Sequence, residues 1–111
     1  MALDVAFYND IAGHTLVSEF LFSLSEKERN KCFQYIDILS EFGNRLTSQY
    51  VKHIEGNIWE LRPEFGGVEM RLFYFIWTGD LIVFLHGFKK KSQKTPSREL
   101  AVAKRRMESL L

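Results

Sequence analysis

Two apolar runs, residues 70–77 and 81–88, constrain the fold more strongly than any other feature of this chain. They read MRLFYFIW and LIVFLHGF, and only the turn sequence Thr78-Gly79-Asp80 separates them. Apolar residues occupy both alternating faces of each run, which is typical of strands at the centre of a sheet. The sequence therefore predicts two neighbouring central strands around which the other elements pack.

Three helices are expected around this sheet. Thr15 suits the N-cap of the first helix, and Ser25 with Glu28 forms an S-x-x-E capping box for the second. The second helix should end at Gly43, and Pro96 suits the first turn of the third. We expect residues 15–42 to form a helical hairpin against one face of the sheet, with the other face left available.

The remaining strands complete an α+β pattern. Residues 3–8, 50–54 and 58–62 read as strands, and residues 63–67 read as a loop. The element order is then β-α-α-β-β-β-β-α. We expect a single domain over residues 1–111, with a mostly antiparallel sheet, the N-terminal helical hairpin packed on it, and a C-terminal helix.

Nothing in the sequence predicts export or membrane insertion. The apolar runs are too short to span a bilayer, and the start MALDVAFYND lacks the basic segment of a signal peptide. The single Cys32 cannot form an internal disulfide, which fits a reducing compartment, and we interpret it as a small core residue. We therefore expect a cytoplasmic protein without a membrane partner.

Charge is distributed unevenly along the chain. Residues 89–111 hold eight basic and two acidic side chains, whereas the first 88 residues hold seven basic and twelve acidic ones. A basic end on an acidic body suggests an anionic partner for that end. The alternative is a solvated helix face, which composition alone would favour. Four of the basic residues follow directly on the strand at residues 81–88: Lys89, Lys90, Lys91 and Lys94.

Arg71 interrupts the first apolar run. Strand alternation places it on the same face as Phe73 and Phe75, where an unpaired guanidinium would be costly. Arg71 must therefore meet a carboxylate, with Glu60 and Glu69 as the candidates, or open onto a polar cleft. The sequence leaves both arrangements open.

His86 interrupts the second apolar run and is equally ambiguous. It could be a core histidine with a satisfied hydrogen bond, or an acid–base group whose pKa lies close to working pH. Gly87 lets another backbone approach closely or lets the strand bend, and Phe88 offers a ring on which a base can stack. The lysines that follow supply attraction for phosphate. The combination favours an RNA-handling surface at the end of this strand.

No metal-binding or cofactor-binding motif is present. His14, His53 and His86 lie far apart in the sequence, and the chain has no pair of cysteines. The sequence FGG at residues 65–67 lacks the lysine and the following helix of a phosphate loop. We therefore expect chemistry without a metal and without a cofactor.

Taken together, IWELRPEFGGVEMRLFYFI and LIVFLHGFKKKSQKTPSRELAVAKRRM resemble the RelE/ParE superfamily of toxins, most closely its phage-derived, HigB-like branch. That branch typically reads W-E-L-R, a short Gly-containing loop, Y-R-x-x-Y, L-H-G-F-x-K-K-x-x-x-T-P and a basic helix. The matching segments here are Trp59–Arg62, Phe65–Gly67, Met70–Tyr74 and His86 through Thr95-Pro96. Met70 departs from the pattern, since it replaces an aromatic residue, but it looks packable. The match covers nearly the whole chain.

The resemblance implies a RelE-like fold and the toxin half of a type II toxin–antitoxin pair. Many members of the superfamily cut mRNA on the translating ribosome and so inhibit translation. Their reaction is metal-free, because the ribose 2′-OH attacks the adjacent phosphodiester. The implied partners are mRNA, the ribosome and an antitoxin, which in this branch often resembles a helix-turn-helix protein.

The resemblance also implies roles for individual residues. Arg71 matches the strand arginine that holds the scissile phosphate, Arg62 matches a second basic position, and Lys89 matches a position near the chemistry. His86 is characteristic of the branch, although its spacing does not decide which way it faces. Glu60 is a possible base or an ion-pair partner of Arg62 or Arg71. The backbone of mRNA or ribosomal RNA would be held by Lys90, Lys91, Lys94 and Arg98.

Two other functions remain open from the sequence. The same basic surface could belong to a non-catalytic module that binds RNA or only an antitoxin. Alternatively, the chain could be a ParE-like toxin directed at DNA gyrase. The basic residues after the last strand favour RNA.

Overall fold

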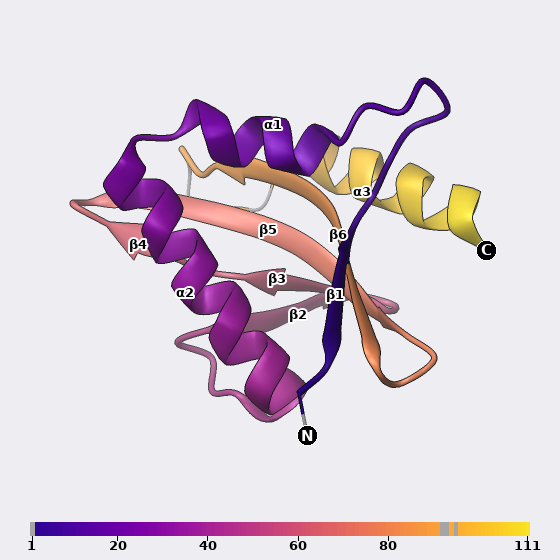
Figure 1. Cartoon of the computed structure of the whole chain (residues 1–111), viewed down its shortest axis with the longest axis horizontal. Helices are drawn as coiled ribbons and strands as arrows, with labels where there is room; N and C mark the ends of the chain where they lie inside the picture. The colour runs from indigo at the N-terminus through magenta and orange to yellow at the C-terminus, as the bar shows by residue number, and fades with distance from the viewer. Residues whose placement is uncertain (1, 92–93, 95) are drawn as a thin grey trace.

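The computed structural model describes residues 2–91, 94 and 96–111, and these residues form an α+β fold (Figure 1). Along the chain the elements are β1 (Asp4–Phe7), α1 (Leu16–Ser23), α2 (Glu26–Phe42), a 3-10 turn η1 (Gly43–Arg45), β2 (Val51–Glu55), β3 (Ile58–Leu61), β4 (Glu64–Phe65), β5 (Val68–Trp77), β6 (Leu81–Lys89) and α3 (Ser97–Leu110). The predicted element order is confirmed, with one additional short strand. Thr95 of the resemblance motif lies outside the described residues.

The sheet is built around the predicted pair of central strands. Its order is β1-β6-β5-β3-β2, and all pairings within it are antiparallel except the parallel pair β1–β6. The expected loop at residues 63–67 is wrong in one respect, because it contains β4, which pairs with the start of β5. Gly66 and Gly67 both have positive φ angles, 59° and 82°, and so close a tight turn that lets β5 begin at Val68.

The helix ends follow the local sequence closely. The Ser25 hydroxyl accepts a bond from the Glu28 N–H (3.2 Å), and the Glu28 carboxylate accepts one from the Ser25 N–H (3.0 Å), which completes the predicted capping box. Gly43, at φ 61°, follows the last residue of α2 as predicted. Thr15 precedes α1, but it does not cap the helix, because its hydroxyl donates to the Asn9 side chain at 2.6 Å.

The expected helical hairpin is not confirmed. Figure 1 shows α1 and α2 meeting at an open angle rather than lying side by side. Extended backbone at Leu24 (ψ 160°) redirects the chain between the two helices. As a result α1 lies along β6, and α2 runs at an angle to it over the same sheet face (Figure 1).

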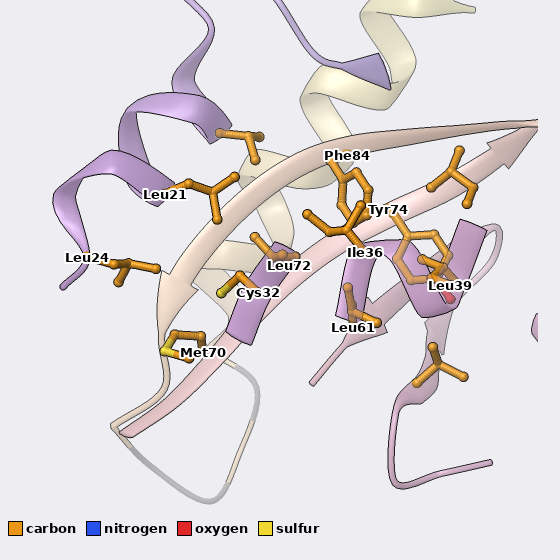
Figure 2. Packing of buried hydrophobic residues seen from close by; sticks show 13 residues of the cluster. Leu21, Leu24, Cys32, Ile36, Leu39, Leu61, Met70, Leu72, Tyr74 and Phe84 are labelled. Atoms are coloured by element: carbon orange, nitrogen blue, oxygen red, sulfur yellow. The ribbon is translucent and has the colours of Figure 1, made fainter. Parts of the chain in front are cut away.

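The core between these helices and the sheet is apolar and closely packed (Figure 2). Met70, the residue that departs from the branch pattern, is fully buried in it and is therefore accommodated by packing. Cys32 is also fully buried there, which confirms it as a core residue. The core members labelled in the figure are Leu21, Leu24, Cys32, Ile36, Leu39, Leu61, Met70, Leu72, Tyr74 and Phe84.

The second sheet face is less available than expected, because α3 packs on it. Ala103 is fully buried in a second core against Phe73, Phe75 and Leu85. The apolar stripe of α3 therefore faces the sheet, as an amphipathic helix requires. Among the described residues, no helix has the length and apolar character needed to cross a bilayer.

A β-bulge in β6 decides where His86 points. Tyr74 is opposite Phe84 and Phe73 is opposite His86, so Leu85 is an extra residue in the β6 strand. Strict alternation would place His86 on the face covered by α1 and α2. The extra residue instead turns both Leu85 and His86 toward α3.

Candidate functional site

A cavity of about 530 Å³ lies at the C-terminal end of β6, between α1 and the start of α3. We call it the β6–α3 cavity. Three of the basic residues predicted to handle RNA line it, together with one carboxylate and a largely apolar remainder. The lining residues are Phe20, Gly87, Phe88, Lys89, Lys91, Pro96, Arg98 and Glu99.

The charge of Lys89 is partly neutralised by a carboxylate at the start of α2. Its Nζ lies 3.6 Å from the Glu28 Oε1, in the same carboxylate that completes the α2 capping box. The Ser25 N–H, reinforced by the charge of Lys89, lowers the pKa of Glu28 below its ordinary value. The start of α2 therefore anchors Lys89 at the cavity wall.

The other predicted RNA-binding residues divide between the cavity and the surface near it. Lys91 and Arg98 are exposed and line the cavity. Lys90 is partly buried, and its backbone N–H donates to the Glu69 carbonyl at 2.8 Å. Lys94 is exposed but does not line the cavity. The structure thus brings together Lys89, Lys91 and Arg98 at one cavity.

His86 lies behind the cavity wall in a three-residue contact that the sequence did not predict. Its Nε2 is 3.0 Å from the Glu99 Oε1, and its Nδ1 is 3.4 Å from the Arg106 Nη1. Arg106 also donates to the Leu85 carbonyl at 2.7 Å. Glu99 is in the first turn of α3, where an acidic residue is common, so no sequence signal singled it out.

The environment of His86 favours its neutral form. Burial lowers the pKa of the imidazole below its ordinary value, and the positive charge of Arg106 acts in the same direction. The hydrogen bond and negative charge of Glu99 oppose this shift without reversing it. His86 is therefore neither a wholly apolar core residue nor an open acid–base group, because it is hydrogen-bonded and only its partner Glu99 lines the cavity.

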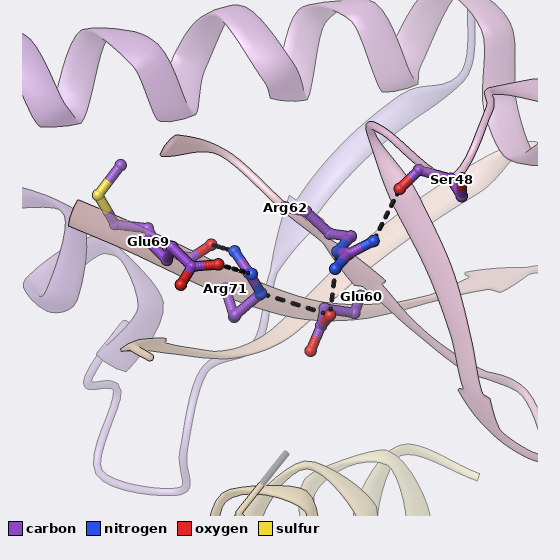
Figure 3. Close-up of polar contacts among 6 residues, drawn as sticks. Ser48, Glu60, Arg62, Glu69 and Arg71 are labelled. Atoms are coloured by element: carbon purple, nitrogen blue, oxygen red, sulfur yellow. Dashed lines mark hydrogen bonds and ion pairs between the residues drawn. The ribbon is translucent and has the colours of Figure 1, made fainter. Parts of the chain in front are cut away.

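Arg71 belongs to a separate polar network between β3 and β5 (Figure 3). Only 2% of the residue is exposed. Its Nη2 donates to the Glu69 Oε1 (2.6 Å), its Nη1 donates to the Met70 carbonyl (2.8 Å), and its Nε is 3.4 Å from the Glu60 Oε1. Of the two arrangements left open by the sequence, Arg71 adopts the ion-paired one.

Glu60 lies between two guanidinium groups in the same network. Its Oε1 is 3.4 Å from the Arg71 Nε and 3.6 Å from the Arg62 Nε, and only 1% of the residue is exposed. Arg62 also donates to the Ser48 carbonyl at 2.8 Å. Glu60 is thus an ion-pair partner of both arginines. Among the described residues, the Glu60 Oε2 and the Arg71 Nε have no hydrogen-bond partner.

Phe88 separates the network from the cavity. It lies opposite Arg71 in the β5–β6 pairing, and it also lines the β6–α3 cavity. Its ring packs against Phe73 at 5.3 Å and against His86 at 5.8 Å between centroids. Arg62, Arg71 and Glu60 are therefore grouped together one strand away from the cavity cations.

Two further features bear on the chemistry available. Burial raises the pKa of the Cys32 thiol to about 12, so this cysteine is not a nucleophile at neutral pH. No group of three His, Cys, Asp or Glu side chains in residues 2–91, 94 and 96–111 is arranged to hold a metal ion.

One comparison with known proteins identifies a match. The family model described as "Phage derived protein Gp49-like (DUF891)" matches residues 19–108, a segment that runs from α1 into α3. This segment includes every candidate site residue named above. No curated protein matches the chain.

Proposed function

Because the chain belongs to the Gp49-like family of phage-derived proteins, a family associated with RelE-like toxins of toxin–antitoxin systems, we propose that it is such a toxin and cleaves mRNA on the ribosome. The proposal includes the finer assignment to the HigB-like branch of the RelE/ParE superfamily. Its place of action would be the cytoplasm, where ribosomes translate.

The observation that carries this proposal is the set of cations around the β6–α3 cavity. Lys89, Lys91 and Arg98 surround a single hollow, and aromatic rings from Phe20 and Phe88 form part of its wall. Cations attract the phosphate backbone, and aromatic side chains stack on unpaired bases. A single-stranded segment of mRNA combines both kinds of group, so it is the ligand that this cavity fits best.

The reaction would need no group beyond those of the protein and the RNA. The ribose 2′-oxygen attacks the neighbouring phosphorus, the bond to the 5′-oxygen breaks, and the products carry a 2′,3′-cyclic phosphate and a 5′-hydroxyl. Cations at the cavity would stabilise the negative charge that develops on the phosphorane oxygens. A proton acceptor for the 2′-OH and a proton donor for the 5′-oxygen complete the requirements.

In the structure described, Glu60, Arg62 and Arg71 would contribute to RNA cleavage only indirectly. The resemblance assigns the scissile phosphate to Arg71, but the guanidinium is already bound by Glu69 and buried beside Glu60. A phosphate would have to displace the Glu69 carboxylate to reach it. Arg62 would keep Glu60 in place, because its Nε faces the same carboxylate.

An antitoxin would neutralise the toxin most directly by covering the β6–α3 cavity. The cavity is lined by three cations and one carboxylate. An acidic segment would complement this charge and block access of RNA. We propose a helix-turn-helix antitoxin as the partner, in keeping with the HigB-like branch.

A non-catalytic binding module is the second candidate function. One observation favours it: the strand arginine and the strand glutamate neutralise each other within the protein, so neither is free to act on RNA. Such a module would bind RNA with a strong salt dependence and leave it intact.

A reconstituted translation reaction tests the proposal. A defined mRNA is translated in the presence of the purified protein, and its 5′ ends are mapped by primer extension. We expect cuts within the coding region, 2′,3′-cyclic phosphate ends, and loss of the cuts in the Lys91→Ala/Arg98→Ala double variant. Both side chains are exposed, so their removal should leave the fold intact. RNA that is bound but uncut would favour the binding module instead.

A further inference from the structure

We propose that Glu99 is the general base of the β6–α3 cavity, and that His86 and Arg106 are positioning residues that act through it. This inference rests on the proposed ribonuclease function. It gives His86, which the sequence left open between a core histidine and an acid–base group, a positioning role.

Access distinguishes Glu99 from the other acidic candidate. Glu99 lines the cavity beside Lys89, Lys91 and Arg98, and 19% of its side chain is exposed. Glu60 is 1% exposed and lies between two arginines. Among the residues that line the cavity, Glu99 supplies the carboxylate, so it is the group that an RNA 2′-OH can reach.

The contact with Arg106 determines which nitrogen of His86 carries the proton. A guanidinium only donates hydrogen bonds, so the Nδ1 that faces the Arg106 Nη1 at 3.4 Å must be the unprotonated nitrogen. The proton of the neutral imidazole is then on Nε2, which donates to the Glu99 Oε1 at 3.0 Å. Glu99 is held through one oxygen, and no described residue forms a hydrogen bond with its Oε2.

Arg106 is itself held firmly enough to impose this arrangement. Its Nη1 donates to the Leu85 carbonyl, and its guanidinium lies over the Tyr8 ring at 5.5 Å from the centroid. The bulge at Leu85 turns His86 toward α3, where Glu99 and Arg106 lie seven residues apart on the same helix. Two side chains of α3 thus contact the imidazole that β6 presents.

A helix-stabilising role is the plain alternative for Glu99. An acidic residue in the first turn interacts favourably with the helix dipole. That role requires neither a histidine contact nor a place at the cavity wall. It predicts that Glu99→Gln affects stability slightly and leaves the chemistry unchanged, which makes the two readings separable.

The 2′-O–H proton passes to the Glu99 carboxylate while the 2′-oxygen bonds to phosphorus. The P–O5′ bond breaks, and the 5′-oxygen takes a proton from a lysine ammonium of the cavity, Lys89 or Lys91. The cations Lys89, Lys91 and Arg98 face the developing negative charge. Glu99 then returns its proton to solvent, and the lysine regains one.

The first test compares Glu99→Gln with Glu108→Gln, an exposed carboxylate of the same helix, in the reconstituted translation reaction. Glutamine keeps the shape and can still accept from His86, but it cannot take the proton. We expect the maximal cleavage rate of Glu99→Gln to fall by about 10²- to 10⁴-fold, with little change in the protein concentration giving half the maximal rate. Glu108→Gln should cut as wild type does.

The outcomes separate this inference from the proposed function. If the wild-type protein and the Glu99→Gln variant cut the mRNA equally fast, the base assignment alone would be overturned. A wild-type protein that leaves the mRNA intact would overturn the ribonuclease proposal and the base assignment together.

A second experiment tests the positioning role of Arg106 without RNA. Nitrogen-15 NMR of the imidazole side chains distinguishes a protonated ring nitrogen from an unprotonated one. We expect His86 in the wild-type protein to carry its proton on Nε2 near neutral pH, and the Arg106→Gln variant to lose this strict preference. A proton on Nδ1 in the wild type would overturn the positioning role of Arg106.

Discussion

The Nη2 of Arg71 lies 2.6 Å from the Oε1 of Glu69. Glu69 is thus bound to the arginine that the family resemblance assigns to the scissile phosphate. Arg71 is buried, whereas 45% of the Glu69 side chain is exposed. The carboxylate is therefore the solvent-accessible half of the pair. If RNA phosphate binds Arg71, it must first displace Glu69, so the acid competes with the substrate.

Glu69→Gln should remove this competition. A partly exposed ion pair contributes about 0.5–1 kcal/mol, so we expect RNA to bind about two- to fivefold more tightly to the variant. Fluorescence anisotropy with a labelled single-stranded RNA measures the change. Glu64→Gln is the matched control, because Glu64 lies directly opposite Glu69 in the β4–β5 pairing and is exposed. Equal affinities in both variants would show that Arg71 does not contact the phosphate.

Arg71→Ala should destabilise the fold. The substitution would leave Glu60 buried without its closest cation, and breaking a buried ion pair in this way costs about 3–5 kcal/mol. Urea unfolding followed by tryptophan fluorescence measures the loss. Arg62→Ala should cost less, because 29% of the Arg62 side chain is exposed and it is the more distant partner. An Arg71→Ala protein as stable as wild type would contradict the network described. Because Arg71→Ala is expected to destabilise the fold, loss of toxicity in this variant would be weak evidence for a catalytic arginine.

Gly87→Ala should disturb the wall of the cavity. A Cβ at this position would lie 2.4 Å from the Phe20 ring and 2.8 Å from the Leu72 side chain. Overpacking of this kind costs about 1–3 kcal/mol, measurable as a lower melting temperature. The Phe20 side chain of α1 makes this close approach, which explains why a glycine follows His86. Phe20→Leu combined with Gly87→Ala should recover part of the loss, and no recovery would indicate that the clash lies elsewhere.

His86 should make stability depend on pH. Burial lowers the pKa of His86 in the folded protein below the ordinary value of 6.5. At pH values between the folded and the unfolded pKa, the unfolded chain therefore binds more protons than the folded protein. The free energy of unfolding should therefore fall as pH decreases from 6.5 through the lower folded pKa, and then level off. His86→Asn should reduce this slope, as urea unfolding at several pH values would show. An unchanged slope would mean that His86 is not held neutral.

Local sequence signals predicted those parts of the fold that depend on neighbouring residues. The Ser25–Glu28 capping box and the glycine end of α2 formed as expected, because both are satisfied within a single turn. The central strands β5 and β6 were likewise evident from their two apolar faces. The angle between α1 and α2 was not, because it depends on packing against the sheet rather than on the helices' own pattern.

The candidate site was predictable in composition but not in arrangement. The lysines and Arg98 stood out as a basic cluster, and three of those cations meet at the β6–α3 cavity. The direction of His86 could not be read from alternation, because the bulge at Leu85 reverses it. Glu99 and Arg106 could not be paired with His86 either, since their contacts arise only when α3 folds back on the sheet.

Mapping of mRNA 5′ ends in cells, after brief induction of the protein, would decide whether the protein cleaves mRNA during translation. The comparison includes wild type, the Lys91→Ala/Arg98→Ala double variant, and Lys52→Ala, an exposed lysine on β2 at the far edge of the sheet. We expect new 5′ ends within coding regions for wild type and Lys52→Ala, and their loss in the double variant at equal protein levels. Growth arrest without new mRNA ends would contradict it and would direct attention to another target, such as DNA gyrase.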